Sequence, residues 1–534
     1  MLERILASTY AEIALVVRDA SPASPREPAW RRLYNYRHHL LYLAYRRLDR
    51  RMFRPQPDAF APRDLGPLLA SVPMLDVVPR RTRFSDRFSP EDLATLKEYD
   101  LDVLVRLGFR ILRGGVLQAA RCGIWSFHHG DPYLFRGGPA GAWEVFLGSP
   151  TTGSVLQILN EELDGGLVLY RSQSCTDSVS LGRSLNGHYW KTLSFLPRKL
   201  AELGRLGSDA FMAKARQSHP TVNLYSERMY TAPRNAEMAR ILVRLGTHMT
   251  RRRVRNLVSV NQWRLVVKKS ESLNGSIDGF REIEPPHGLF WADPNIHEHQ
   301  GRCYVFCEEY SHRTGKGSVV LFAIGEDGKW PDKPLPILET PYHLSYPFVF
   351  THGGQIHMMV ECSTERRVES YRCVEFPHRW EGPTVLLDNI SAVDATLHEQ
   401  DGRWWMFANM VENEGAMPWD ELFLFHTADP FGGKWTPHPL NPIVSDVRRA
   451  RPAGRLFWQD GKLVRPAQNC AGGYGRGIVF NHVLKLNETE YEECPIAQIQ
   501  PNWHPGIRAT HTFARGGGWT VCDADRWRSR LSRK

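Results

Sequence analysis

The chain has 534 residues, of which 42% are hydrophobic and 24% are charged, and its formal net charge is +10. This length exceeds what one hydrophobic core normally supports, so we expect a multidomain globular protein. No apolar run is long enough to cross a bilayer, and we expect a cytoplasmic location with no membrane span. Nine cysteines without a Cys-x-x-Cys pair argue against a disulfide framework and against a structural zinc site, so no metal is expected.

Positive charge gathers in two places, Arg251 to Arg255 and the tail from Arg526 to Arg530. Such patches can attract anionic partners, but a solvated linker and tail account for them as well. We expect no nucleic-acid partner.

Short apolar runs and helical patterns alternate along the first part of the chain. Strands are predicted at 12–17, 102–108 and 124–128, an amphipathic helical insert at 28–52, and a helix at 114–122. This alternation is typical of a doubly wound α/β sheet, whose ligands bind at the carboxyl ends of the strands. His128 ends the third predicted strand and would lie at such a site.

An ordered set of short motifs follows this strand. The motifs are Ser126-Phe127-His128, Asp131-Pro132, Arg136-Gly137-Gly138-Pro139, Thr152-Gly153 and Leu163-Asp164-Gly165-Gly166. The set resembles the catalytic core of the folate-dependent formyltransferases, the family of methionyl-tRNA and amino-sugar formyltransferases. The resemblance implies a Rossmann-like formyltransferase fold over residues 1–232. Members of that family open with an earlier strand that is missing here, so either the start is assigned late or the sheet has lost an edge.

The resemblance also implies roles for individual residues. His128 would be the general base, Asp164 its orienting carboxylate, and Ser126 a substitute for the family's asparagine that polarises the formyl carbonyl. Arg136, Gly137 and Gly138 would form the loop beside a 10-formyltetrahydrofolate donor. A carboxylate beside an imidazole raises its basicity, so the histidine can take a proton from an attacking amine. The same residues would serve a formyl-folate hydrolase with water as the acceptor.

A basic helical linker is predicted at 233–258, and from residue 259 short β-rich runs replace helical patterns. One phrase, a strand followed by a glycine-bearing turn and a second strand, recurs five times at a spacing of roughly 50 residues. The copies begin at Asp293, Tyr346, Asp394, Arg451 and Arg508. Five copies predict a five-bladed β-propeller over 259–534, with 262–267 as the strand that closes the last blade. A β-sandwich with coincidental turns is the alternative.

The blade phrases resemble the propellers of family-43 and related glycoside hydrolases, and more closely the N-terminal domain of the plant glucosamine inositolphosphorylceramide transferases. In those hydrolases, carboxylates from several blades meet at the axis as acid and base. Asp293, Glu361 and Asp394 are the corresponding residues here, with Arg451 and Arg508 at the equivalent position of the last two blades. Such a ring could be a catalytic centre, an anion-binding socket or a structural charge network.

Two functions follow from these observations. The first is a formyltransferase that moves a formyl group from the folate donor to an amine on an amino-sugar or nucleotide-sugar substrate, while the propeller binds the saccharide. The alternative is a glycan-binding or glycoside-hydrolase-like propeller protein whose formyltransferase domain has lost its chemistry. Ser126 in place of asparagine favours the alternative.

Overall fold

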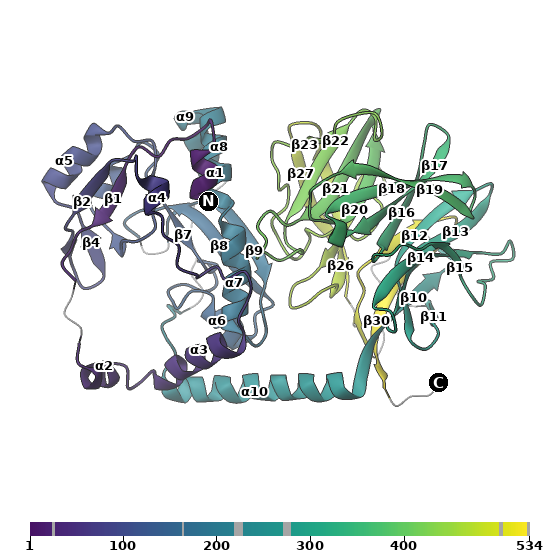
Figure 1. Cartoon of the computed structure of the whole chain (residues 1–534), viewed down its shortest axis with the longest axis horizontal. Helices are drawn as coiled ribbons and strands as arrows, with labels where there is room; N and C mark the ends of the chain where they lie inside the picture. The colour runs from purple at the N-terminus through teal and green to yellow at the C-terminus, as the bar shows by residue number, and fades with distance from the viewer. Residues whose placement is uncertain (24–26, 163–164, 218–227, 271–278, 501–505, 531–534) are drawn as a thin grey trace. The chain divides into compact units, whose positions relative to one another are not determined.

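The computed structural model describes the chain apart from residues 24–26, 163–164, 218–227, 271–278, 501–505 and 531–534. The chain divides into two compact units (Figure 1). Unit 1 comprises Met1–His248 and Glu412–Met417, and unit 2 comprises Met249–Val411 and Pro418–Lys534. The boundary falls inside the helix α10 (Asn235–Val258), which covers the predicted basic linker. Among the described residues, no helix is long and apolar enough to cross a membrane.

Unit 1 mixes helices with short strands. Its other helices are α1 (Leu2–Leu6), α2 (Ala29–Asn35), α3 (Leu40–Met52), α4 (Gly66–Leu69), α5 (Pro90–Glu98), the 3-10 helix η1 (Gly115–Gln118), α6 (Ala142–Leu147), α7 (Leu181–Thr192), α8 (Phe195–Leu206) and α9 (Ser208–Gln217). Its strands are β1 (Val16–Asp19), β2 (Met74–Val77), β3 (Arg80–Arg81), β4 (Ser85–Arg87), β5 (Leu104–Arg106), β6 (Ile111–Leu112), β7 (Ile124–His128), β8 (Thr151–Ile158) and β9 (Leu167–Cys175).

These strands form three separate sheets. β1 pairs with β2, β3 and β6 flank β4, and the third sheet has the order β5-β7-β8-β9. Only β5 and β7 run parallel in the third sheet, because the chain reverses after β7 and again after β8. The Rossmann-like formyltransferase fold is therefore not shown. The predicted strand 124–128 is confirmed, whereas the predicted helix 114–122 is reduced to η1.

Unit 2 is built from five sheets, each of four or five strands (Figure 1). The first sheet contains β12 (Leu289–His299), β13 (Arg302–Ser311), β14 (Lys316–Ala323) and β15 (Leu335–Leu338). The second contains β16 (Ser345–His352), β17 (Gln355–Cys362), β18 (Arg367–Glu375) and β19 (Arg379–Leu387), with the 3-10 helix η2 (Ser363–Glu365) between β17 and β18. The third contains β20 (Ala392–Gln400), β21 (Arg403–Met410), β22 (Leu422–Thr427) and β23 (Thr436–Pro437), and the fourth contains β24 (Phe457–Gln459), β25 (Lys462–Asn469), β26 (Gly477–Leu486) and β27 (Tyr491–Ile499). The fifth contains β10 (Ser259–Lys268), β11 (Arg281–Ile283), β28 (Ile507–Ala509), β29 (Phe513–Gly516) and β30 (Trp519–Ser529).

Successive sheets share a hydrophobic core, and the ring of cores closes. One cluster joins the first and second sheets, and others join the second to the third, the third to the fourth, and the fourth to the fifth. A further cluster joins the fifth sheet back to the first. A single sheet cannot bury both of its faces, so each depends on its neighbours. This is the architecture of a five-bladed β-propeller.

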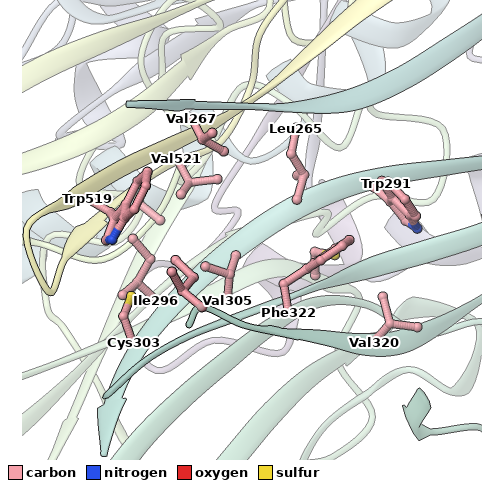
Figure 2. Packing of buried hydrophobic residues seen from close by; sticks show 13 residues of the cluster. Leu265, Val267, Trp291, Ile296, Cys303, Val305, Val320, Phe322, Trp519 and Val521 are labelled. Carbon is pink, nitrogen blue, oxygen red and sulfur yellow. The ribbon is translucent and has the colours of Figure 1, made fainter. Parts of the chain in front are cut away.

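The ends of the propeller are joined by one long antiparallel pair. β10 lies beside β30 from Ser259↔Ser529 to Lys268↔Thr520, which confirms that the run 262–267 closes the last blade. Figure 2 shows the cluster that this closure forms against the first sheet. In Figure 2, Leu265 points from β10 toward Phe322, and Val521 lies beside Val267, above Ile296 and Val305. Leu265 and Val521 are fully buried.

Replacing Leu265 by alanine should therefore weaken the whole propeller. Removing a fully buried leucine side chain costs about 2–5 kcal/mol through lost burial and the remaining cavity. Leu484 is 48% exposed in the same unit, so Leu484→Ala should change the free energy of unfolding by less than about 1 kcal/mol. Urea unfolding of both variants measures the difference. Equal losses of unfolding free energy in the two variants would contradict the view that the closing strand stabilises the propeller.

Candidate functional site

Three innermost strands begin with a bulge that holds a non-glycine residue in the left-handed region. The φ angle is 54° at Asp293, 47° at Tyr346 and 51° at Asp394. At each of them the ladder with the next strand shifts register. A bulge re-aims a side chain, and a left-handed residue with a Cβ costs on the order of 1–3 kcal/mol unless its surroundings hold it. Polar contacts hold each of these residues in place.

Two positions recur in every blade when residues are counted from the turn. Seven residues before the first turn residue stand Asp293, Tyr346, Asp394, Ala453 and Thr510. Fifteen residues further on stand Glu308, Glu361, Asn409, Gln468 and Asp525. The predicted equivalence of Arg451 and Arg508 with Asp293 is thus wrong by two residues. Arg451 and Arg508 stand nine residues before the turn, whereas Asp293, Tyr346 and Asp394 stand seven residues before it.

Asp293 takes part in a buried chain of charges with His511 and Asp523. His511 Nε2 lies 2.9 Å from Asp293 Oδ1, and His511 Nδ1 lies 2.9 Å from Asp523 Oδ2. Burial alone would lower the pKa of His511, but the two carboxylates raise it well above its ordinary value. Burial alone would raise the pKa of Asp293, but the His511 charge and hydrogen bond hold it below its usual range. The group is an imidazolium between two carboxylates.

The same group of charged residues joins blades that are adjacent in the ring. The backbone N–H of Asp293 donates to Asp523 Oδ2 at 3.2 Å, and the backbone N–H of Tyr346 donates to Asp293 Oδ2 at 3.3 Å. Thr512 Oγ1 donates to Asp293 Oδ1 at 3.0 Å. These bonds link the fifth, first and second blades through one carboxylate. They supply the surroundings that the left-handed conformation of Asp293 needs.

Asp394 is the second centre of the network. Its carboxylate pairs with the Arg451 guanidinium, and Gln468 Nε2 donates to Asp394 Oδ2 at 2.7 Å. The backbone N–H of Asp394 donates to Glu361 Oε2 at 2.9 Å. Asp394 is 2% exposed, so the Arg451 charge is needed to offset the cost of burying it. Three of the predicted site residues, Glu361, Asp394 and Arg451, are thereby brought together from three blades.

Two glutamates in the network stand beside carboxylates. Burial raises the pKa of Glu308 well above its ordinary value, and the charge of nearby Asp293 adds to this rise. Burial likewise raises the pKa of Glu361 to about 8, with a further contribution from Asp394. The charge of Glu361 also acts on Glu308, so the two halves of the network lie within electrostatic reach. At neutral pH the site holds carboxyl groups of both kinds, ionised and protonated.

An aromatic side chain gives the network a solvent-facing side. Tyr474 lies in the glycine-rich loop between β25 and β26 and is 36% exposed. Its ring centroid lies 5.1 Å from that of His511, and the Arg451 guanidinium lies 4.8 Å from the same ring. Trp419 is its aromatic neighbour, at 6.2 Å between centroids. Tyr474 therefore connects both charge centres with the surface.

Asp293, His511 and Asp523 also have the spacing of three metal ligands. Each offers one ligand atom, and these atoms lie within 4.8 Å of one another. A metal ion would require His511 to give up its proton, which the two carboxylates oppose. The two carboxylates would stabilise either positive charge, the imidazolium or a metal ion, and the absence of a metal stays a prediction.

Arg508 lies apart from this network. Its guanidinium pairs with Asp525 and stacks on Trp527 at 3.8 Å. Its side chain is 30% exposed, and no described contact joins it to Asp293 or Asp394. The prediction that Arg508 faces the same site as Arg451 is therefore not supported by its contacts.

The residues predicted around the formyl site lie in unit 1. His128 ends β7, and a Cβ on Gly130 would lie 3.3 Å from His128 Nε2 and 3.7 Å from Glu144 Oε1. Burial raises the pKa of Glu144 to about 8. Asp164, the predicted partner of His128, lies outside the described residues. Ser126 is buried and its Oγ accepts a hydrogen bond from Arg106 Nε at 3.0 Å, so it faces β5.

The predicted donor loop is occupied by another segment of unit 1. The backbone N–H of Tyr230 donates to the Arg136 carbonyl at 2.8 Å, and the N–H of Gly138 donates to the Tyr230 carbonyl at 3.0 Å. A Cβ on Gly137 would lie only 2.4 Å from that carbonyl oxygen. The glycines of this loop thus permit close backbone pairing with Tyr230, which is a structural reason for their presence.

Comparison with known families places the likeness in the propeller. A family described as "Glucosamine inositolphosphorylceramide transferase 1, N-terminal" matches residues 284–511. The glucosamine inositolphosphorylceramide transferase 1 of Oryza sativa subsp. japonica is 34% identical over 250 residues, which cover 44% of this chain and 33% of the relative. The protein of that name from Arabidopsis thaliana is 34% identical over 211 residues, or 39% of this chain and 27% of the relative. The chain spans about a third of the length of these relatives.

Solved structures share sheets of this kind at low similarity. A family 117 glycoside hydrolase of Zobellia galactanivorans covers 51% of this chain and 91% of its own, with 12% identity and a TM-score of 0.32. The catalytic domain of a family 62 α-L-arabinofuranosidase of Coprinopsis cinerea covers 45% and 92%, with 13% identity and a TM-score of 0.33. A likeness at this level says nothing about activity.

These comparisons correct the functional prediction. The resemblance of the propeller to the plant transferases is confirmed. The prediction of a formyltransferase, with one-carbon transfer as its chemistry, is wrong: the relatives are named as glucosamine inositolphosphorylceramide transferases, a different kind of transferase. The folate donor was expected only as a consequence of that activity and stays an untested prediction. The cytoplasmic location also stays a prediction.

The pH dependence of stability should report the protonated state of Glu361. Its pKa rises from 4.5 to about 8 on folding. The contribution of protonated Glu361 to the free energy of unfolding is therefore fully present below pH 4.5 and is lost as pH rises through 8. Each pKa unit corresponds to about 1.4 kcal/mol. Glu361→Gln keeps the neutral form, and its melting temperature should fall less than that of the parent between pH 5 and 9.

The exposed Glu399 on β20 provides the control. Glu399→Gln should follow the parent at every pH. If Glu361→Gln loses as much stability as the parent over the same pH range, Glu361 is ionised in the folded protein.

Proposed function

We propose that the centre of the propeller binds a sugar that carries an amino group. The observation that carries this proposal is the excess of carboxyl groups over cations in the buried network. Two cations, Arg451 and His511, face three carboxylates, Asp293, Asp394 and Asp523, and two carboxyl groups with raised pKa values, Glu308 and Glu361, lie beside them. An ammonium group that reached Glu361 would supply the missing positive charge.

The partly exposed residues favour the same ligand. Tyr474 offers an aromatic face at the surface of the network, and such faces combine an apolar body with a polar end. Glu361 is less deeply buried than Asp394, which leaves part of it accessible. The names of the relatives, which contain glucosamine, support an amino sugar over a neutral one. Asp293, Glu361, Asp394 and Arg451 are the proposed binding residues.

Binding of an amino sugar should release a proton from the protein. A cation near Glu361 lowers the pKa of that carboxyl from about 8, so the proton leaves as glucosamine enters. Calorimetry of the full chain with glucosamine at pH 7, in two buffers of different ionisation enthalpy, measures this release. Glu361→Gln should bind glucosamine about tenfold more weakly, a loss of about 1.4 kcal/mol, and release no proton.

Two controls separate the ammonium group from the rest of the sugar. Glucose should bind the parent and Glu361→Gln equally. Tyr474→Ala should weaken both sugars, whereas Trp458→Ala, which removes a ring that is 58% exposed elsewhere on the propeller, should weaken neither. Equal binding of glucose and glucosamine to the parent would reject the proposed role of the carboxyl groups.

Cleavage of a glycosidic bond is the second candidate function. The observation that favours it is the difference in pKa between two carboxyl groups. The pKa of Glu361 is raised to about 8, whereas the pKa of Asp293 lies below its ordinary value. Glycoside hydrolysis uses such a pair, one carboxyl to protonate the leaving oxygen and one carboxylate as base or nucleophile. Glu361 would be the acid and Asp293 the carboxylate.

Hydrolysis and binding make different predictions for Glu361→Gln. General acid catalysis contributes about 10²–10⁴-fold, so the variant should lose that much kcat on a 4-nitrophenyl glucosaminide while KM changes little. An absence of turnover by the parent on amino-sugar and neutral glycosides alike would reject hydrolysis and leave binding in place.

A further inference from the structure

Unit 1 contains a large apolar cavity between two of its sheets. Its volume is about 910 Å³, within the range of pockets that hold ligands. Residues 10–17, which lead into β1, form one wall, and residues 101–109 around β5 form another. Side chains of α1 and α8 line it as well, together with Leu96 of α5. All of these residues belong to unit 1.

Both walls are sheet edges. Among the described strands, β1 pairs with β2 alone, and β5 is the end strand of its sheet. The N–H groups of Val16 and Ala20 bond toward β2, at Pro73 and Val77, so the main-chain groups of Val17 face away from β2. In the part of the chain that the structure describes, no strand pairs with that side of β1.

The same reasoning applies to β5. The N–H of Leu104 donates to the Gly123 carbonyl next to β7, so the main-chain groups of Val103 and Val105 face away from β7. Val105 and Val17 both line the cavity. The cavity is therefore bounded on its two long sides by main-chain donors and acceptors for which the described sheets provide no strand.

The side chains of the walls pack with two different hydrophobic cores. Ala11, Ile13, Val103 and Val105 pack with the cluster that contains Ile5, Trp125 and Phe195. Leu15, Val17, Leu101 and Leu104 pack with a second cluster, which contains Leu96, Leu112 and Ile124. Around β5 the successive residues Val103, Leu104 and Val105 thus alternate between the two cores, as side chains do on the two faces of a strand. An inserted strand would complete both cores.

We propose that this cavity is a binding slot for an extended apolar peptide, which adds as a strand between β1 and β5. A peptide supplies main-chain groups for both edges and side chains for both cores, the mode of recognition known as β-strand addition. An acyl chain would fill the same volume but would leave the edge N–H and C=O groups without partners. The wall lengths suit a strand of about five residues.

The test joins a peptide to the full chain. Met1 lines the cavity, so a five-residue strand of alternating valine and threonine, placed before Met1 through a short glycine-serine linker, reaches the slot at high effective concentration. Hydrogen exchange should slow by about tenfold or more at the amides of Val17 and Val105, which lie on the two edges. The amide of Leu104, already bonded toward β7, should change little.

The matched control replaces the central valine of the added strand by proline, which cannot donate to a ladder. It should give no protection at Val17 or Val105. Equal protection by the two strands, or none by either, would overturn the proposal. Displacement of the bound strand by a fluorescent fatty acid, with the edge amides left unprotected, would identify an acyl pocket instead and would also overturn it.

Val105→Trp fills the slot from the β5 side and should abolish the protection at Val17. If this variant does not fold, the valine and proline strands still decide the question on the parent chain. These readouts come from unit 1 and are separate from sugar binding by the propeller.

Discussion

The propeller depends on how it neutralises charge at the junction of its blades. Asp293, Asp394 and Asp523 are almost completely buried, and a carboxylate in such a place is stable only with a cation or several hydrogen-bond donors. His511 and Arg451 provide the cations, and backbone N–H groups of adjacent blades provide further donors. Because each carboxylate bonds to a blade other than its own, the network and the ring of sheets stabilise each other.

The backbone is adapted to the same requirement. Asp293, Tyr346 and Asp394 adopt left-handed conformations that glycine would adopt at no cost. Glycine, however, has no side chain to bring to the centre. The strained residues instead contribute two carboxylates and the hydroxyl of Tyr346, which forms a hydrogen bond with Thr396 Oγ1 at 2.8 Å. Strain held in place by a polar network is a feature of functional sites, and it agrees with a ligand at this centre.

The fold of the second half could be predicted from sequence because its signal is local and repeated. The glycine-bearing turns fix the hairpins, and the run 262–267 closes the ring as its hydrophobic pattern indicated. The site was only partly predictable. Asp293, Glu361 and Asp394 stand out as acidic residues in the blade phrases, but Glu308 could have been found only by noticing that it occupies the same place after the turn as Glu361.

Two failures have physical causes that the sequence does not show. His511 and Asp523 lie in the last blade and meet Asp293 only because the ring closes, so their partnership is invisible to local reasoning. In the first half, the resemblance places the Arg136–Gly138 loop beside a folate donor, whereas that loop pairs with the backbone at Tyr230. The fold prediction also failed on strand direction. An apolar run indicates a strand, but it does not show whether that strand runs parallel or antiparallel to its neighbour.

A crystal structure of the full chain soaked with glucosamine would test the central claim most directly. The account predicts the sugar at the centre of the propeller, its ammonium group within hydrogen-bonding distance of Glu361 and its ring against Tyr474. A sugar bound elsewhere, with the contacts among Asp293, His511, Asp394 and Arg451 unchanged and closed to solvent, would show that the network serves the structure of the ring alone.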